Sequence, residues 1–332
     1  MKTGFIGAGR VGFSLGKYLV SHRVTVSGYY DHTPEHAAQA AEFTGTKAFR
    51  TPGELTEDCD LLFLTTPDGV IRDVWDEIRD ESVRKASAYQ DESAGQPGAH
   101  RDDIALKSGV IRDNVSQCMR ELSELPLAGK IICHCSGSLT SEIFEGIRET
   151  GAVGCSLHPM LAFSDRYESY RQLENAFFTV EGDERAVAQM TELFESLGNR
   201  VCPIEADKKA LYHTAASVLS NQVVAVLDTG YRLLMQCGFS EEEARSASER
   251  LVRGNVDHVI RDGCVQALTG PIERGDAETV RKHLGCLEGE DRRMYRVLGR
   301  KLTEVAQAKH PEKDYGEIGQ ILHENVTVTS TS

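Results

Sequence analysis

Three histidines occupy positions from which an imidazole could exchange a proton near neutral pH. His134 lies within an apolar run, His158 follows another such run, and His213 lies in a segment with helical spacing. When hydride transfer converts a carbonyl to an alcohol or an imine to an amine, a protein group must also supply or accept a proton. We therefore take His158 and His213 as candidate catalytic residues and His134 as a buried supporting group. Ordering of the loop after Pro159 is the alternative role for His158.

A polar stripe extends from His213, because His213, Ser217 and Asn221 recur at every fourth position. At 100° per residue these positions span an arc of about 80° on one helix face. Such a stripe predicts either a cleft wall, which makes all three catalytic candidates, or hydrogen bonds between helices of a dimer. Lys208 and Lys209, one turn earlier, are expected on the solvated surface or in ion pairs between domains.

A glycine turn near the N-terminus follows an apolar run at residues 2–6 and opens a segment with helical spacing. Gly7 permits the tight turn, Gly9 lets the backbone approach a pyrophosphate, and Gly12 lets the helix pack closely on the strand. The free N–H groups and the dipole of the helix N-terminus then attract phosphates. The predicted cofactor-binding residues of this turn are Gly7, Ala8, Gly9, Arg10, Val11 and Gly12.

The expected cofactor is a nicotinamide dinucleotide, NAD or NADP, because Asp31 ends the second predicted strand. An acidic group at this place accepts hydrogen bonds from the adenosine ribose and repels a 2′-phosphate, which favours NAD. His32, which is also expected to contact the cofactor, follows where related NADP enzymes often carry arginine, so NADP stays an alternative. A capping or turn role is the alternative for Asp31. The end of the fourth predicted strand is expected to contact the cofactor through Thr65, Thr66 and Pro67.

The elements that must position these residues alternate between strand and helix over the first part of the chain. This alternation predicts an α/β fold, with a Rossmann-like and mostly parallel sheet covered by helices on both faces, followed by an all-α C-terminal domain. We place the dinucleotide-binding domain at residues 1–205, with a charged insertion at about 80–108 that is expected to form an exposed loop. The helical domain follows at 206–325, and residues 326–332 are expected to form a disordered tail.

Composition argues against several classes of partner. The 332 residues hold 37 Lys and Arg against 51 Asp and Glu, a net charge of −14, so most of the surface would repel a nucleic acid. No apolar run approaches the ~18–20 residues of a membrane span, and no signal peptide is recognised. The nine cysteines include no CxxC pair, which argues against a metal site or a disulfide framework. We expect a cytoplasmic protein with a small-molecule substrate, no metal, and no nucleic-acid or membrane partner.

Several motifs together resemble one family of proteins. They are the glycine turn, Cys133-His134-Cys135-Ser136-Gly137-Ser138, Ser156-Leu157-His158-Pro159-Met160, Leu211-Tyr212-His213, Ser220-Asn221 and residues 268–276. The chain resembles, over residues 2–284 apart from the insertion, an uncharacterised family that joins a Rossmann-like domain to a C-terminal domain of unknown function. That family is similar to pyrroline-5-carboxylate reductase and to the 6-phosphogluconate and 3-hydroxyisobutyrate dehydrogenases. The resemblance implies a homodimer through the helical domain and a substrate between the domains, against the nicotinamide.

A weaker likeness, to prephenate dehydrogenases, concerns the segment after the fifth predicted strand. In that family a serine and a His-Pro pair belong to the active site, which would make Ser136 a catalytic candidate and Ser138 a substrate-binding one. The chain lacks the lysine that accompanies that serine and the family's continuation after the His-Pro pair, so prephenate is not expected as the substrate. It also lacks a convincing Lys-x-x-x-Asn motif of the hydroxyacid dehydrogenases. Arg274, on a predicted turn, could bind a substrate carboxylate or form a surface ion pair.

These residues favour an NAD(P)-dependent oxidoreductase that transfers hydride to or from a C=O or C=N group of a small metabolite. A non-catalytic dinucleotide-binding or sensing protein with a dimerising helical domain is the alternative, because a fold does not dictate a reaction. A third hypothesis is a hydride donor of the deazaflavin type beside NADP.

Overall fold

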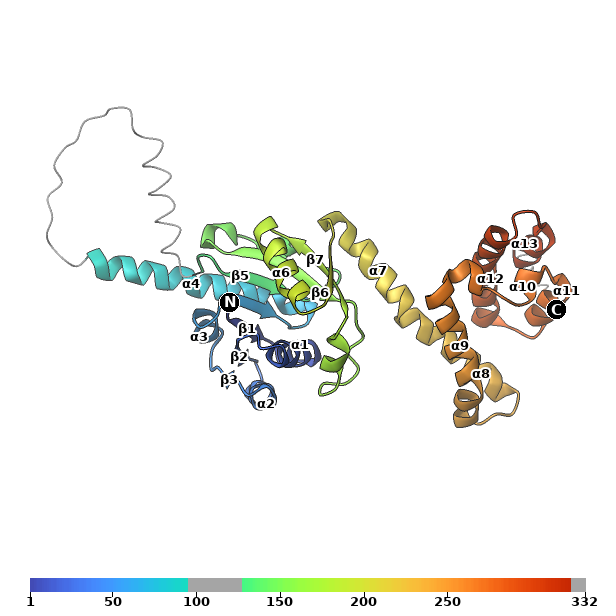
Figure 1. Ribbon diagram of the computed structural model, residues 1–332, viewed down its shortest axis with the longest axis horizontal. Coiled ribbons are helices and arrows are strands. Elements are labelled where there is room, and N and C mark those ends of the chain that lie inside the picture. The colour runs from blue at the N-terminus through green and yellow to red at the C-terminus, as the bar shows by residue number, and fades with distance from the viewer. Residues whose placement is uncertain (95–126, 324–332) are drawn as a thin grey trace, which may run out of the picture. The chain divides into compact units, whose positions relative to one another are not determined.

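The computed structural model describes residues 1–94 and 127–323 of the chain (Figure 1). Its contacts divide the chain into two compact units, Met1–Ser220 (unit 1) and Asn221–Ser332 (unit 2). The sequence predicts a boundary near residue 205, whereas unit 1 also includes helix α7 (Lys209–Leu219). Helix α7 belongs to unit 1 because the side chain of its first residue is buried against a strand of the sheet and the turn that follows the neighbouring strand.

Unit 1 is built around one eight-stranded sheet with the strand order β3-β2-β1-β4-β5-β6-β7-β8. Strands β6 and β7 pair antiparallel, and every other pair of neighbours is parallel. This arrangement confirms the predicted Rossmann-like, mostly parallel sheet. The strands are β1 (Thr3–Ile6), β2 (Val26–Tyr30), β3 (Lys47–Ala48), β4 (Leu61–Leu64), β5 (Ile131–His134), β6 (Val153–Pro159), β7 (Phe177–Gly182) and β8 (Arg200–Pro203).

Helices cover both faces of this sheet, as predicted. On one face, α1 (Arg10–Ser21), α2 (Pro34–Thr44) and α6 (Glu184–Ser196) pack against a core in which Phe5 stacks between Tyr29 and Phe63. On the other face, α3 (Pro52–Glu57) and α4 (Ile71–Ala94) pack around the buried side chain of Trp75. The central strands β1, β4 and β5 are buried at every residue, which explains their continuous apolar runs.

Helix α4 extends into the segment for which the sequence predicts an exposed, charged loop. It continues to Ala94, so the loop prediction is wrong for residues 80–94. The polar composition of this segment misleads because Glu, Lys, Arg and Ala are all good helix formers. The rest of the predicted insertion and the predicted tail at 326–332 lie outside the described residues.

Short 3-10 helices connect several elements of unit 1. They are η1 (Asp68–Val70), η2 (Ser141–Ile143), η3 (Arg148–Thr150), η4 (Ser169–Leu173) and η5 (Ala206–Lys208). Of these, η4 lies beside α1, so the loop that leads from β6 into η4 comes close to the N-terminal part of the sheet (Figure 1).

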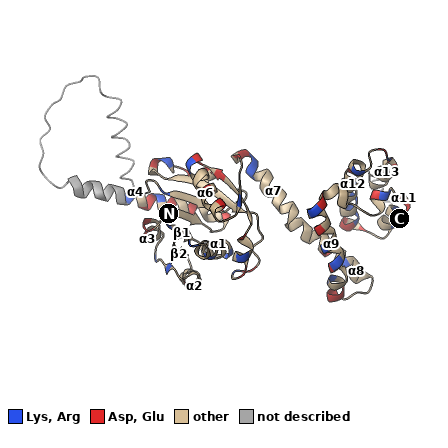
Figure 2. Cartoon of the chain, viewed as in Figure 1, with Lys and Arg blue, Asp and Glu red and all other residues tan. Residues whose placement is uncertain are grey.

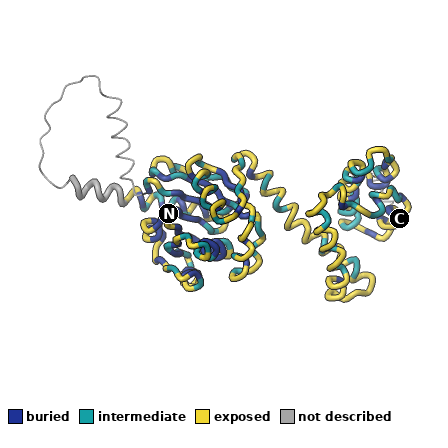
Figure 3. Tube along the Cα trace, in the orientation of Figure 1, coloured by how far each residue is buried: buried dark blue, intermediate teal, exposed yellow. Residues whose placement is uncertain are grey.

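Unit 2 contains helices and no strand in its described residues, which agrees with the predicted all-α domain. Its small core lies between the shorter helices and includes Ile272, Val280 and Leu322. Most side chains of the first two helices of this unit are exposed (Figure 3). The helices are α8 (Asn221–Gln236), α9 (Glu241–Ala267), α10 (Pro271–Arg274), α11 (Ala277–Gly285), α12 (Gly289–Lys309) and α13 (Gly316–His323).

Taken together, the consecutive helical segments of Ala206–Gln236 are long and apolar enough by length and composition to cross a membrane, and their apolar window is not buried. The sequence-based expectation that no such stretch exists is therefore wrong. Helix α7, within this stretch, carries a single charged residue, Lys209 (Figure 2). An exposed apolar stretch of this kind fits a helix that packs on another protein surface as well as it fits a membrane span.

Candidate functional site

The glycine turn lies where β1 and β4 run side by side, at the point where the strand order of the sheet reverses. Open α/β sheets bind ligands at this point, outside the carboxyl ends of the strands. Gly7 has a φ of +100°, a left-handed conformation that favours glycine. A Cβ on Gly12 would lie 2.3 Å from the carbonyl oxygen of Gly7 and 2.3 Å from Oγ1 of Thr65. The turn is therefore packed tightly between the start of α1 and the end of β4.

The residues of this turn fit the pyrophosphate of a dinucleotide. Gly9 is the N-cap of α1, no side chain caps this helix end, and its first turn contains no acidic residue. A Cβ on Gly9 would meet no described atom within 4 Å, so the space beside it is open. Arg10 is exposed at the first residue of the helix, and Val11 follows it half-buried. An open helix N-terminus with a neighbouring cation attracts phosphate.

Asp31 ties the glycine turn to the start of α2. Its Oδ2 accepts a hydrogen bond from the N–H of Ala8 at 2.7 Å, and its Oδ1 accepts one from the N–H of Thr33 at 2.9 Å. The two oxygens of a carboxylate can accept about four hydrogen bonds, so acceptor capacity remains for the hydroxyls of a ribose. His32 lies exposed beside Asp31. The structure thus gives Asp31 the turn-forming role and leaves the ribose-binding role as a prediction.

The end of β4 contacts the glycine turn directly. Oγ1 of Thr65 donates a hydrogen bond to the carbonyl oxygen of Gly7 at 2.6 Å. The hydroxyl of Thr66 is buried and has no hydrogen-bond partner among the described residues. Pro67 is exposed and precedes η1. Of the three residues predicted at this strand end, Thr65 is the one whose side chain fixes the turn.

Asp68 joins the end of β4 to the turn that follows β5. Its Oδ2 accepts hydrogen bonds from Oγ of Ser136 at 2.8 Å and from Oγ of Ser138 at 3.2 Å. Oγ of Ser136 also accepts from the N–H groups of Ser138 and Leu139, at 3.2 Å and 3.1 Å. Both predicted serines therefore lie at the carboxyl edge of the sheet, in one network with Asp68. The Ser136 hydroxyl is fully engaged, which suits it to fixing the turn.

Lys209 also belongs to this site, although the sequence predicts a lysine on the solvated surface or in an ion pair between domains. Its side chain is 1% exposed, and Nζ donates hydrogen bonds to the carbonyl oxygen of Ser136 at 2.9 Å and to Oγ of Ser156. Burial lowers the pKa of Lys209 below its ordinary value. The prediction is wrong because these partners lie 73 and 53 residues away in the sequence. One feature of the sequence could have indicated that Lys209 belongs to the site: it lies one helical turn before His213.

His134 supports the same turn, as predicted. The ring is fully buried, and Nδ1 accepts a hydrogen bond from the N–H of Ser136 at 3.2 Å. This bond assigns the ring proton to Nε2, which lies 3.2 Å from the carbonyl oxygen of Thr140 and donates to it. Burial lowers the pKa of His134 to about 4, and the nearby Lys209 cation acts in the same direction. The imidazole is therefore neutral at pH 7.

His158 and His213 meet over Gly137. Their ring centroids are 6.0 Å apart and the rings are nearly perpendicular. A Cβ on Gly137 would lie 2.5 Å from Nδ1 of His213 and 2.9 Å from Nε2 of His158. His158 lies inside β6, whereas the sequence predicts it after the strand. The strand is longer than predicted because β7 pairs with it antiparallel as far as Pro159.

Tyr212 orients the ring of His158. Its hydroxyl oxygen lies 2.7 Å from Nδ1 of His158, which leaves Nε2 facing Gly137. Burial lowers the pKa of His158 to about 4, and the charges of Lys209 and His213 lower it further. A neutral imidazole can accept a proton or donate a hydrogen bond. The pair of histidines is thus equipped for proton exchange with a small ligand.

The polar stripe predicted from His213 is interrupted. Helix α7 ends at Leu219 and α8 begins at Asn221, with Ser220 between them at φ −117° and ψ −74°. Ser217 lies half-buried in α7 with His213, whereas Asn221 is the first residue of unit 2. The single continuous helix predicted for these residues is therefore wrong.

Arg274 also lies in unit 2, exposed at the end of α10. Its carbonyl oxygen accepts a hydrogen bond from Nζ of Lys313 at 2.7 Å. Within the described part of the chain its guanidinium forms no ion pair, so the predicted surface ion pair is not found there. Its substrate-binding role and the location of the substrate between the domains stay predictions.

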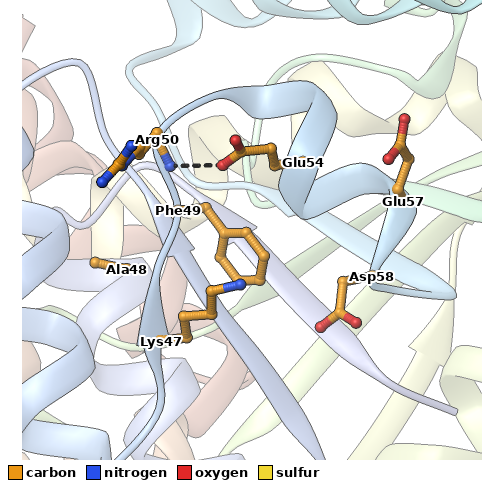
Figure 4. Close-up of a pocket in the computed structure, with 7 residues that line it drawn as sticks. All are labelled: Lys47, Ala48, Phe49, Arg50, Glu54, Glu57 and Asp58. Atoms are coloured by element: carbon orange, nitrogen blue, oxygen red, sulfur yellow. Dashed lines mark hydrogen bonds between the residues drawn. The ribbon is translucent and has the colours of Figure 1, made fainter.

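A separate hollow of about 530 Å³ lies at the β3 edge of the sheet (Figure 4). Its lining carries charges of both signs, and the backbone N–H of Arg50 donates to the Glu54 carboxylate at 3.1 Å. It contains none of the residues predicted to bind cofactor or substrate. The lining residues are Lys47, Ala48, Phe49, Arg50, Glu54, Glu57 and Asp58.

Two family models match the chain. Residues 2–87 match the model described as NADP oxidoreductase, coenzyme F420-dependent, and residues 176–302 match a domain of unknown function, DUF2520. The chain carries both domains. Its N-terminal domain is that of an NAD(P)-dependent oxidoreductase, and the resemblance indicated by the sequence motifs is confirmed. The DUF2520 match begins just before β7, so this domain includes the last strands of the sheet as well as most of the helical region.

Solved structures share the fold. A Thermotoga maritima protein has a TM-score of 0.63 at 22% identity, over 92% of this chain and 99% of that one. An imine reductase from Pseudomonas sp. has a TM-score of 0.55 at 16% identity, over 97% and 99% of the two chains. A Plasmodium falciparum pyrroline carboxylate reductase with NADP bound has a TM-score of 0.52 at 11% identity, over 96% and 98%. Comparison with curated protein sequences finds no significant match.

Proposed function

We propose that the protein is an NAD(P)-dependent oxidoreductase that transfers hydride to or from a C=O or C=N group of a small metabolite. The observation that carries this proposal is that the predicted cofactor-binding turn and the histidine pair are both connected to the end of strand β4. Thr65, just after β4, donates a hydrogen bond to the glycine turn. Asp68, three residues later, accepts one from Ser136 in the turn after β5, whose Gly137 lies against both histidines. The similarity in fold to imine and pyrroline carboxylate reductases supports a C=N substrate in particular.

The roles of the protein groups follow from their geometry. When bound, the nicotinamide ring supplies or accepts the hydride. The glycine turn and the N-terminus of α1 hold the phosphates, and Asp31 binds the adenosine ribose. His158, held by Tyr212 and neutral at pH 7, takes the proton from an alcohol or amine in the oxidative direction. His213 faces the same space over Gly137 and completes the proton-exchanging pair.

The test compares binding with turnover. Purified protein is assayed for NADH and NADPH oxidation with a panel of small carbonyl compounds, with and without amines, and for the reverse reaction with alcohols and amines. His158→Gln and His213→Gln should lower kcat at least about tenfold and leave cofactor binding within about twofold, because neither ring belongs to the cofactor turn. His22→Gln, a half-buried histidine at the C-terminal end of α1 and so at the opposite end of that helix from the glycine turn, serves as the matched control.

Tight dinucleotide binding without turnover of any compound would support the sensing alternative instead. Loss of cofactor binding in the two catalytic variants would also contradict the proton-exchanging roles of His158 and His213, since it would place the histidines in the cofactor site. The description of the N-terminal family names coenzyme F420, so the absorbance spectrum of the purified protein and its binding of that coenzyme belong in the same experiment.

We also propose that unit 2 mediates a homodimer. Leu251 and Ile260 of α9 are 76% and 78% exposed, and Val224 of α8 is 67% exposed. Unit 2 also has a largely apolar hollow of about 400 Å³ between α8 and α12. Contiguous exposed apolar surface marks an interaction site in a soluble protein. Light scattering should give twice the chain mass, and Leu251→Lys with Ile260→Lys should give the monomer mass; a monomeric wild-type protein would contradict the proposal.

A further inference from the structure

We propose that Arg166 binds the 2′-phosphate of NADP(H), a role that rests on the proposed function. Arg166 lies in the loop between β6 and η4, and its Nη2 donates a hydrogen bond to the carbonyl oxygen of Ala8 at 2.8 Å. It reaches the glycine turn from 158 residues further along the chain. The sequence motif of the turn therefore gives no indication of it.

Ala8 is bonded on both sides by charged groups. Its N–H donates to the carboxylate of Asp31 at 2.7 Å, and its carbonyl oxygen accepts from the guanidinium of Arg166. The carboxylate alone would repel a phosphate on the ribose. A guanidinium held beside the same residue opposes that charge and offers planar, paired donors to phosphate oxygens.

Helix α2 connects the two charged groups. Nδ1 of His36 lies 3.6 Å from Oδ1 of Asp31, and Oε1 of Gln39 accepts a hydrogen bond from Nη1 of Arg166 at 2.9 Å. His36 and Gln39 are three residues apart and therefore neighbours on one helix face, with Cβ atoms about 5–6 Å apart. Asp31 and Arg166 thus border one patch at the start of α2, where such folds bind the adenosine ribose.

The charge of Arg166 is not neutralised by a carboxylate. Among the side chains that the structure describes, no carboxylate lies within ion-pair distance of Arg166, and its buried Nε has no hydrogen-bond partner. Arg171, five residues later, instead pairs with Glu168 at 2.7 Å. A guanidinium has five N–H donors, so donors remain on Arg166 beyond the bonds to Ala8 and Gln39.

Packing against α1 holds the loop in position. The guanidinium of Arg166 lies over the ring of Phe13, 4.4 Å from its centroid, and the ring of Tyr167 packs edge-on against Phe13 at 4.9 Å. The carboxylate of Asp165 accepts a hydrogen bond from the N–H of Tyr167 at 2.7 Å. The cation is therefore presented by an ordered loop, which reduces the entropy lost when a ligand binds.

Calorimetry of NADPH and NADH binding tests the proposal. Arg166→Gln should weaken NADPH binding at least about tenfold and change NADH binding less than about twofold, because NADH lacks the 2′-phosphate. Arg171→Gln removes a charge from the same region and should leave both affinities unchanged. Asp31→Asn removes the repulsion and should strengthen NADPH binding relative to NADH.

Two results would overturn the proposal. Equal weakening of both cofactors in Arg166→Gln would show that the residue only supports the glycine turn, and unchanged NADPH binding would show that the phosphate lies elsewhere. Retained NADH binding in the variant is itself the control for folding. A wild-type protein that binds neither dinucleotide would overturn the proposed function together with the role of Arg166, which separates that failure from the other two.

Discussion

Lowering the pH from 7 to 5 is expected to destabilise unit 1 by about 2 kcal/mol for each of two histidines, His134 and His158. Burial lowers the pKa of both His134 and His158 from 6.5 to about 4, and the Lys209 cation adds to both shifts. The two rings lie on neighbouring strands, His134 at the end of β5 and His158 near the end of β6. Neither ring can gain a proton without placing a charge beside Lys209.

The direction of the effect follows from proton linkage. Between pH 6.5 and pH 4 the unfolded chain binds a proton at each histidine and the folded chain does not, so acid favours unfolding. The stabilisation is complete above pH 6.5 and is lost as the pH falls toward 4. A difference of about 2.5 units corresponds to about 3.4 kcal/mol per histidine in full, of which about 2 kcal/mol is lost by pH 5.

Tryptophan fluorescence measures this effect in unit 1 alone, because Trp75 is the one tryptophan of the chain and is fully buried there. Urea unfolding is followed at pH 7, 6 and 5 for the wild-type protein, for His134→Gln and for the control His32→Gln. Glutamine can donate to Thr140 and accept from Ser136 but does not titrate. The His134→Gln protein should lose about 2 kcal/mol less stability between pH 7 and pH 5 than the other two.

Equal losses in all three proteins would refute the reasoning. So would an NMR titration in which the His134 ring takes up its proton near pH 6.5. A lower stability of His134→Gln at every pH would not refute the reasoning, because the prediction concerns the change in stability between pH values and not the stability at any one pH.

Three further substitutions test the geometry of the site. Gly137→Ala places a Cβ 2.5 Å from Nδ1 of His213, so it should lower kcat about 10- to 100-fold and leave cofactor binding intact. Gly69→Ala is the control: its Cβ meets no described atom within 4 Å, so it should change neither kcat nor cofactor binding. Gly12→Ala places a Cβ 2.3 Å from the Gly7 carbonyl and should weaken dinucleotide binding at least about tenfold by calorimetry and destabilise unit 1 by ~1–3 kcal/mol. Lys209→Met removes the cation beside His158, so the pKa of His158 measured by NMR should rise, yet stay below 6.5 because burial is the larger cause.

The sequence predicts the fold and the cofactor turn well because their determinants are local. A short apolar run, a glycine at the left-handed position of Gly7 and helical spacing after Gly12 define strand, turn and helix within about twenty residues. Continuous apolar runs identify the central strands because helices cover both faces of the sheet. The prediction of where α4 ends is wrong because no local signal marks that end: charge content does not distinguish an exposed helix from an exposed loop.

The chemistry of the site is less predictable because it depends on contacts between distant segments. Lys209 has charged neighbours in the sequence, and only the bonds to Ser136 and Ser156 distinguish it from a solvated lysine. Arg166 likewise joins the glycine turn only through its hydrogen bond to the carbonyl oxygen of Ala8. Buried cations are rare enough that sequence reasoning places each lysine on the surface by default.

The same buried lysine bears on the direction of catalysis. With a pKa of about 4, His158 carries its second proton in roughly 0.1% of molecules at pH 7, so it is poorly suited to donate one. The ring is free to accept a proton, but it does so as a weak base. In the oxidative direction His158 can therefore act directly as the base. In the reductive direction the proton must come from another group, such as His213, or the substrate must arrive already protonated, as an iminium ion does. Removing the Lys209 charge should then favour reduction of neutral carbonyl compounds more than that of iminium ions, because only the former need the protein to donate a proton.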